Sequence, residues 1–262
     1  MADPVYQGIE LLEEINQLDL SDPVSEFTLR RLWHSAQQVA AHDLATGSLA
    51  MAMLRGIRHD LEGACRYVEQ CASQLGQVHE AWLSQAALLH NLSQDEEAAA
   101  KAMGGLEHHP NSPELLRIAI DSLHARGYLS RAAELGRLYE HRVGEDAFLR
   151  EVRGSWQEIE AVLTARGVTE QDLQDVARLV YEVAFERGVY RRKLVALRTA
   201  QDDGEPWVAM LVVPANLEQR QRLRLSRDLV KRLVESELPA FEEGAVVPRF
   251  TAQFQKKAAG DE

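Results

Sequence analysis

The sequence is poor in cysteine and in aromatic residues, and the shortage of cysteine argues against a disulfide-rich fold. Its 262 residues include two cysteines, Cys65 and Cys71, and aromatic residues make up 6% of the chain. The two cysteines are six positions apart on one predicted helix, which separates their Cα atoms by about 9 Å, beyond the reach of a disulfide bond. We therefore expect both to be reduced and to serve as small buried side chains.

Long apolar runs are also missing. No stretch approaches the roughly 20 apolar residues that a helix needs to cross a bilayer. The first residues, Met-Ala-Asp-Pro-Val, lack the basic region and apolar segment of a secretory signal. We therefore expect a cytoplasmic protein that has no membrane contact.

The common signatures of enzymes are absent. The chain has no glycine-rich phosphate loop, no serine elbow, no His-Glu-x-x-His pattern and no paired cysteine motif. All nine histidines lie at or before His141, in no spacing that indicates a metal site. The sequence therefore predicts a protein that is not an enzyme and that holds no cofactor or metal.

A period of 34 residues dominates the first half of the chain. Small residues recur at this interval in three columns, which are Ala64, Ala98 and Ala132, then Ala52, Ala86 and Ile120, then Cys65, Ala99 and Ala133. Helices that cross closely need small side chains where their axes approach. A fixed period of this length is typical of a helix–turn–helix solenoid.

The repeat resembles the tetratricopeptide repeat (TPR) over residues 45–146. In the second repeat, Trp82, Ala86, Ala98 and Pro110 stand at positions 4, 8, 20 and 32, where that family places Trp, small residues and Pro. The first repeat (45–78) and the third (113–146) lack this Trp and Pro. The resemblance implies three antiparallel helix pairs whose concave groove binds a segment of a partner protein.

The predicted fold is mainly α, with a TPR-like solenoid followed by a small α+β domain. Helices at 4–18 and about 23–41 cap the first repeat, and a helix at 146–166 closes the third, which gives a first domain of residues 1–167. Residues 168–255 have the order α-β-β-α-β, and residues 256–262 form a disordered tail. The predicted elements of the second domain are a helix at 169–186, a strand at 189–199, a strand at 207–213, a helix at 217–237 and an edge strand at 246–254.

Negative charge is concentrated in the repeat half. The net charge is −12, and residues 1–146 carry 22 acidic and 11 basic side chains, whereas residues 147–262 carry 19 and 18. An acidic repeat surface disfavours nucleic acid and favours a basic or polar protein partner. The alternative is that the charge only confers solubility.

The TPR resemblance implies a set of groove residues. Ligands of that family contact positions 2, 5, 9 and 12 of the first helix of each repeat. Leu49, Met53 and Ala87 occupy positions where chaperone-binding members carry Lys and Asn, so the resemblance does not extend to that ligand. The groove should instead suit a peptide or an amphipathic helix, or its side chains only pack against the capping helices. The candidate groove residues are Leu49, Met53, Glu80, Leu83, Ala87, His90, Arg117, Asp121 and His124.

A second candidate surface lies in the C-terminal unit. Spacings of four, three and four place four cations on one face of the predicted helix at 217–237, where they would bind phosphates or an acidic protein, or simply face solvent. The alternative function is therefore a nucleic-acid-associated protein or nuclease, although the strand at 207–213 lacks the carboxylates and lysine of a nuclease centre. The same unit is a candidate for homodimer formation. The four cations are Arg220, Arg224, Arg227 and Lys231.

Overall fold

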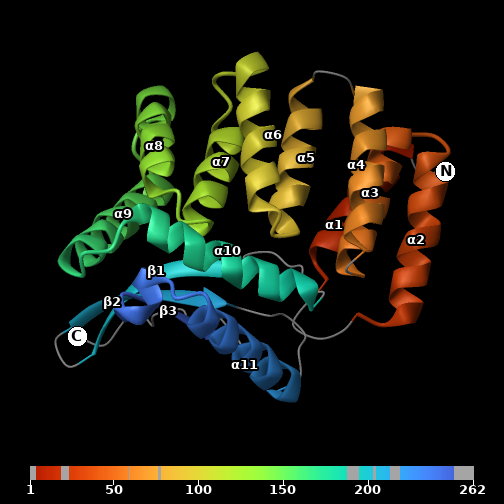
Figure 1. Cartoon of the computed structure of the whole chain (residues 1–262). Coiled ribbons are helices and arrows are strands. Elements are labelled where there is room, and N and C mark those ends of the chain that lie inside the picture. Colours follow the sequence, from red (N-terminus) through yellow and green to blue (C-terminus); the bar gives the residue numbers. More distant parts are fainter. Residues whose placement is uncertain are drawn as a thin grey trace, which may run out of the picture.

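The computed structural model describes residues 4–18, 24–58, 60–75, 78–187, 195–202, 205–212 and 219–250. Within these ranges ten consecutive helices precede a three-stranded sheet and two further helices, which confirms the mainly α fold with a small α+β unit at its end. Helices α2 to α8 stand side by side, and α10, the sheet and α11 lie below the lower ends of helices in that row (Figure 1).

The helices pair in a repeat-like order that is compatible with a solenoid. The second helices of the three predicted repeats begin at Leu61, Asp95 and Leu129. These starts are 34 residues apart, as the sequence predicts. Ser112 caps the third repeat by accepting from the N–H of Leu115. The eight helices are α1 (Pro4–Asn16), α2 (Glu26–Ala40), α3 (Leu44–Ile57), α4 (Leu61–Leu75), α5 (His79–Asn91), α6 (Asp95–His108), α7 (Pro113–Ala125) and α8 (Leu129–Val143).

The predicted small residues lie at the helix contacts. Ala64, Ala98 and Ala132 are fully buried, and so are Ala52 and Ala86. A larger side chain at these positions would have to displace the neighbouring helix, because protein interiors are close-packed. The 34-residue columns therefore mark the inner surfaces of the stack.

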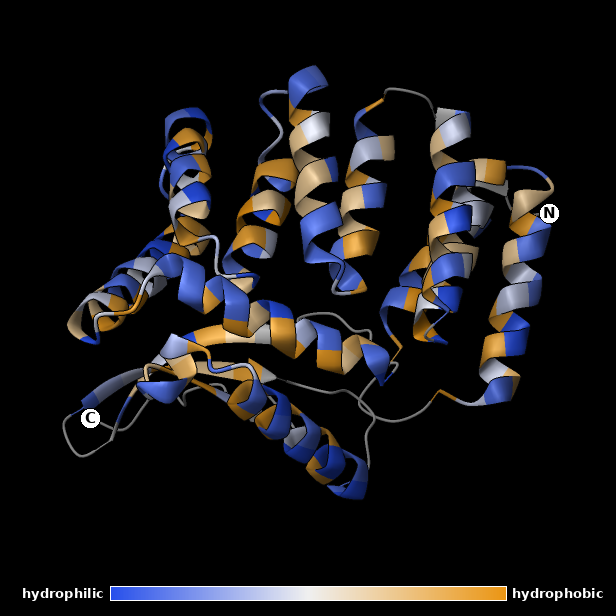
Figure 2. Cartoon of the chain, in the orientation of Figure 1, coloured by the Kyte–Doolittle hydropathy of each residue, from blue (hydrophilic) through white to orange (hydrophobic). Residues whose placement is uncertain are grey.

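Helices cover both ends of the repeats. Helices α1 and α2 share an apolar cluster with Leu54 of α3. At the other end, α9 (Ala147–Ala165) packs Trp156 and Leu149 against α8 so closely that a Cβ on Gly136 would lie 2.5 Å from the Trp156 ring. Orange and blue residues alternate around most of the helices in Figure 2, as expected for elements that bury one side.

The C-terminal unit keeps the predicted order of elements with shifted bounds. Thr169 and Asp172 form a capping box at the start of α10. The first strand ends three residues later than predicted, and the predicted residues 189–194 lie outside the described part of the chain, as do 251–255 and the tail at 256–262. A short helix, α12, was not predicted. The elements are α10 (Glu170–Glu186), β1 (Val195–Asp202), β2 (Glu205–Val212), α11 (Gln219–Glu235), α12 (Pro239–Glu242) and β3 (Val246–Phe250).

The sheet has the order β1-β2-β3, with β1 antiparallel and β3 parallel to β2. Among the described residues, β3 pairs with β2 alone, so the strand that contains Pro248 lies at an edge of the described sheet, as predicted. Leu197 and Met210 lie opposite each other and are buried, as are Val208 and Val246, so this face of the sheet belongs to the apolar core.

One apolar core contains residues from both sides of the predicted domain boundary at 167/168. It joins Ile120 of α7 and Trp156 of α9 to Leu173 of α10, Met210 of β2 and Leu229 of α11. The turn between α7 and α8 contributes to this contact, because a Cβ on Gly127 would lie 3.0 Å from Leu173. The predicted boundary at 167/168 stays a prediction, and the packing shows that the two units share buried surface.

Two expectations concern the chain as a whole. Cys65 and Cys71 are both free thiols, and Cys71 is buried whereas Cys65 is half-buried. Burial raises the pKa of each thiol above its usual value. In the described ranges, none of the helices combines the length and apolar character needed to span a membrane.

Candidate functional site

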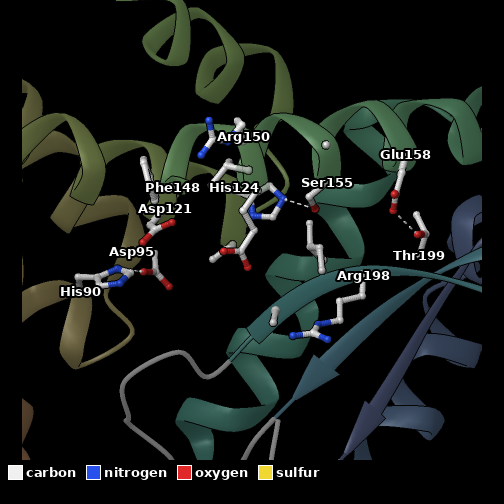
Figure 3. A pocket seen from close by; sticks show the side chains of 16 residues that line it. His90, Asp95, Asp121, His124, Phe148, Arg150, Ser155, Glu158, Arg198 and Thr199 are labelled. Carbon is white, nitrogen blue, oxygen red and sulfur yellow. Dashed lines mark hydrogen bonds and ion pairs between the residues drawn. The ribbon is translucent and has the colours of Figure 1, made fainter. Parts of the chain in front are cut away.

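A polar cleft lies where the repeats meet the C-terminal unit. It has a volume of about 1050 Å³, and its walls are the C-terminal ends of α5 and α7, one side of α9, and β1 (Figure 3). Four of its side chains are carboxylates and two are guanidinium groups. The residues around the cleft are His90, Asp95, Asp121, His124, Ala125, Phe148, Arg150, Glu151, Val152, Gly154, Ser155, Glu158, Ala196, Leu197, Arg198 and Thr199.

A buried hydrogen-bond network forms one end of the cleft. Asp95, at the first position of α6, is 3% exposed. Its Oδ1 lies 2.9 Å from Nδ1 of His90, and its Oδ2 accepts a 2.6 Å bond from the hydroxyl of Tyr181 in α10. Because a carboxylate only accepts, the proton lies on Nδ1 of His90. This network ties α5, α6 and α10 together.

Tyr181 contributes to the network as a neutral donor. Its side chain is 1% exposed, and the guanidinium carbon of Arg126 lies 3.6 Å from the centre of its ring. Burial, and then the negative charge of Asp95, raise the pKa of Tyr181 well above its usual value. The hydroxyl therefore stays protonated and donates a hydrogen bond to Asp95.

The network does not form a nucleophilic triad. The hydroxyl of Ser122 lies 2.9 Å from Nδ1 of His90, the same nitrogen that Asp95 uses. In a triad the serine and the carboxylate bond opposite nitrogens of the histidine ring, so that the histidine, oriented by the carboxylate, can take the proton of the serine hydroxyl. Here Ser122 and Asp95 share one ring nitrogen, and Nε2 of His90 forms no hydrogen bond to a described residue.

Helix α9 supplies the opposite wall. Asp146 caps this helix by accepting from the N–H of Leu149, and that bond is the main reason why the pKa of Asp146 is lowered. The part of α9 from Phe148 to Glu158 then borders the cleft, with the hydroxyl of Ser155 3.3 Å from Nε2 of His124. At Gly154, an added Cβ would meet no heavy atom within 4 Å, so the helix surface is open at this position.

Strand β1 supplies a third wall. Four consecutive residues, 196–199, border the cleft. Thr199 donates a 2.7 Å bond from its hydroxyl to Glu158 of α9, which fixes the distance between strand and helix. Figure 3 shows this bond as a dashed line between Glu158 and Thr199.

The predicted groove residues fall into two groups. His90, Asp121 and His124 border the cleft. The other six are elsewhere. Met53 and Leu83 are half-buried beside apolar clusters, and Arg117 is exposed and donates to Tyr139 and Asp146. Of the remaining three, Leu49 and Ala87 are half-buried and Glu80 is exposed.

Several cleft residues were not predicted from the sequence. Arg150, Gly154, Ser155 and Glu158 lie on the helix that the sequence assigns to closing the repeats, and Thr199 lies on a strand with no polar motif. The cleft depends on how the sheet is placed against α7 and α9. No local pattern in the sequence carries that information.

The predicted cation patch lies on α11. Arg220, Arg224, Arg227 and Lys231 are all exposed, on the side of the helix opposite the buried Leu229. Lys231 lies 3.6 Å from Glu235, and the three arginines have no ion pair in the described part of the chain. Three exposed apolar residues, Leu223, Val230 and Val234, run beside these cations.

No group of three potential metal ligands occurs in the residues that the structure describes. The cleft therefore offers polar and charged side chains as its means of recognition. Comparisons with protein-family models, with curated proteins and with solved structures find no match to the chain.

Proposed function

We propose that this protein is a non-enzymatic interaction module whose cleft holds a segment of a partner protein. The observation that carries this proposal is the position of His90, Asp121 and His124. The resemblance to the TPR implies that these three residues contact a ligand, and they border one cleft of about 1050 Å³. A TPR-like origin of the helix pairs belongs to the same proposal.

The lining of the cleft favours a polar protein segment. Small-molecule pockets are mostly apolar and have volumes of roughly 300–1,000 Å³. This cleft, at about 1050 Å³, lies just above that range, and carboxylates, guanidinium groups and imidazoles stand among the apolar residues of its three walls. Such a surface can bond both the backbone and the side chains of a peptide.

A variant at Gly154 tests the proposal. Because a Cβ there meets nothing within 4 Å, Gly154→Trp places a large ring at the cleft without a clash at its base, and replacing a helical glycine also removes a cost of roughly 0.5–1 kcal/mol. Gly154→Ala is the matched control. We expect Gly154→Trp to lose the partners that the wild type and Gly154→Ala capture, measured by affinity purification and mass spectrometry.

The experiment has one refuting outcome and one control for folding. Equal recovery of the same partners by all three proteins would refute the cleft as the binding site. Thermal melts of the three proteins show whether the fold is intact, and a loss of partners counts only for a variant that melts as high as the wild type. These partners would be expected to carry an accessible polar segment.

A second candidate function is favoured by the exposed face of α11. Four cations on one side of a helix, three of them without an ion pair among the described residues, can neutralise phosphates. In this alternative, the C-terminal unit binds nucleic acid. The salt dependence of binding distinguishes the two candidates, because contacts to phosphates weaken steeply with added salt.

A further inference from the structure

The two edges of the sheet differ in how well they are protected. Edge strands are commonly short, charged or interrupted by proline or a bulge, which prevents pairing with another chain. Strand β3 follows that rule, with five residues and Pro248. Strand β1 does not. Its eight residues pair one to one with β2 and include no proline, and Arg198 is the only charged residue before Asp202.

The register shows which backbone groups of β1 point away from the sheet. The N–H of Val208 donates to the carbonyl of Ala245, so Val208 points towards β3. The next residue, Ala209, must then point towards β1, where its partner is Arg198. Because directions alternate along a strand, the N–H and C=O groups of Leu197 and Thr199 point out from the free edge.

The two residues that carry these outward groups lie at the cleft, with Thr199 half-buried and Leu197 buried. Leu197 and Thr199 both border it. Neither backbone forms a hydrogen bond to another element in the part of the chain that the structure describes. The cleft therefore has a row of backbone donors and acceptors along one wall, at the spacing that an added strand requires.

The opposite walls indicate the chemistry of that strand. Thr199 and Leu197 lie on the sheet face that looks towards α9, as the bond from Thr199 to Glu158 shows. A residue added beside Thr199 would share this face and would approach Glu158, with Glu151 on the same helix. Asp95 is buried, which leaves three carboxylates, Asp121, Glu151 and Glu158, against two guanidinium groups. The cleft therefore favours basic side chains at alternate positions.

We propose that the cleft binds its partner by strand addition, in which an extended peptide with basic side chains at alternate positions pairs with the free edge of β1. This inference rests on the proposed function and specifies how the same cleft recognises its partner. The four residues 196–199 span about 13 Å at roughly 3.3 Å per residue. The core of the peptide is therefore about four residues long.

The first experiment uses the full chain and a phage library of random heptapeptides. We expect selected peptides to carry Lys or Arg at alternate positions between β-formers. Hydrogen exchange is then measured by NMR with the best synthetic peptide. Strand addition predicts slower exchange of the Leu197 and Thr199 amides on binding, and no change at Arg198 or Ala200, whose amides already face β2.

Substitutions give a second measurement. Thr199→Pro removes one outward N–H, whereas Thr199→Val keeps it and removes only the hydroxyl. We expect Thr199→Pro to weaken the binding of the selected peptide roughly 5–10-fold or more, and Thr199→Val to have a smaller effect on binding. If Thr199→Pro unfolds the chain, N-methylated versions of the selected peptide serve as the test instead, with one backbone N–H blocked at a time. Methylation at one set of alternate positions, those whose N–H groups would pair with β1, should lower the affinity, and methylation at the other set should not.

The outcomes separate this inference from the proposed function. Peptides that Gly154→Trp excludes, but that leave the exchange of Leu197 and Thr199 unchanged, would overturn strand addition and keep the cleft as the binding site. Peptides that Gly154→Trp does not exclude, or a selection without enrichment, would overturn both.

Discussion

The bond between Tyr181 and Asp95 is the sharpest test of how the C-terminal unit is held against the repeats. Tyr181→Phe removes a single hydroxyl that donates at 2.6 Å to a carboxylate that is 3% exposed. Hydrogen bonds to charged groups contribute about 1.5–3 kcal/mol, and the unpaired Oδ2 of Asp95 stays buried. We expect the free energy of unfolding to fall by about that amount.

Urea unfolding followed by circular dichroism measures this loss. For a chain of this size, the melting temperature should fall by about 3–12 °C. Tyr128→Phe is the matched control, because Tyr128 is half-buried and its hydroxyl forms no hydrogen bond to a described residue. We expect a change within about 0.5 kcal/mol for that variant. Equal unfolding midpoints for Tyr181→Phe and the wild type would refute the role of the network.

The same variant has a pH signature. The pKa of Tyr181 is raised well above its usual value in the folded chain, whereas an unfolded tyrosine titrates near pH 10. The folded state therefore keeps a proton that the unfolded state loses, and stability falls as pH rises above about 10. The advantage of the wild type over Tyr181→Phe should shrink there. An advantage that stays constant from pH 8 to 11 would contradict this argument.

Three further predictions concern other parts of the chain. Asp146→Ala removes the cap of α9 and should cost about 0.5–2 kcal/mol, whereas Asp146→Asn should cost less because asparagine also caps helices; equal losses in urea melts would contradict the capping role. The sequence predicts that residues 1–167 fold alone, and we expect this fragment to melt below the full chain, because α10 shares the core of the third repeat. An equal melting temperature by circular dichroism would show that the units are independent. For the second candidate function, Arg224→Glu with Arg227→Glu should reduce the log–log salt slope of duplex DNA binding by about two, and a wild-type slope near zero would exclude that function.

The repeat half was largely predictable because its signals are local. Ala98 and Ala132 stand one period apart and are both fully buried, and Ser112 caps its helix as the pattern Ser-Pro-Glu indicates. Helix propensity, capping and small-residue spacing act within one or two turns of a helix. The order of elements in the C-terminal unit followed from similar local patterns.

The cleft was only partly predictable because it depends on contacts between distant segments. His90 and His124 were candidates through their repeat position, yet their partners, Asp95 and Ser155, were not. Arg117 was predicted to contact a ligand by analogy, and its bond to Tyr139 of α8 was not predicted. Side-chain direction at a helix end depends on the neighbouring element, which the sequence pattern does not specify.

The long span of the Tyr181–Asp95 bond has a consequence for synthesis on the ribosome. The two residues are 86 positions apart, and chains grow at roughly 5–20 residues per second. About 4–17 s therefore pass between the appearance of α6 and that of α10. During that interval the nascent repeats expose the Asp95 carboxylate and the surface that α10 later covers. The cleft, whose walls include β1, is complete only after this delay, so a segment bound as proposed above would meet the finished protein and not the growing chain.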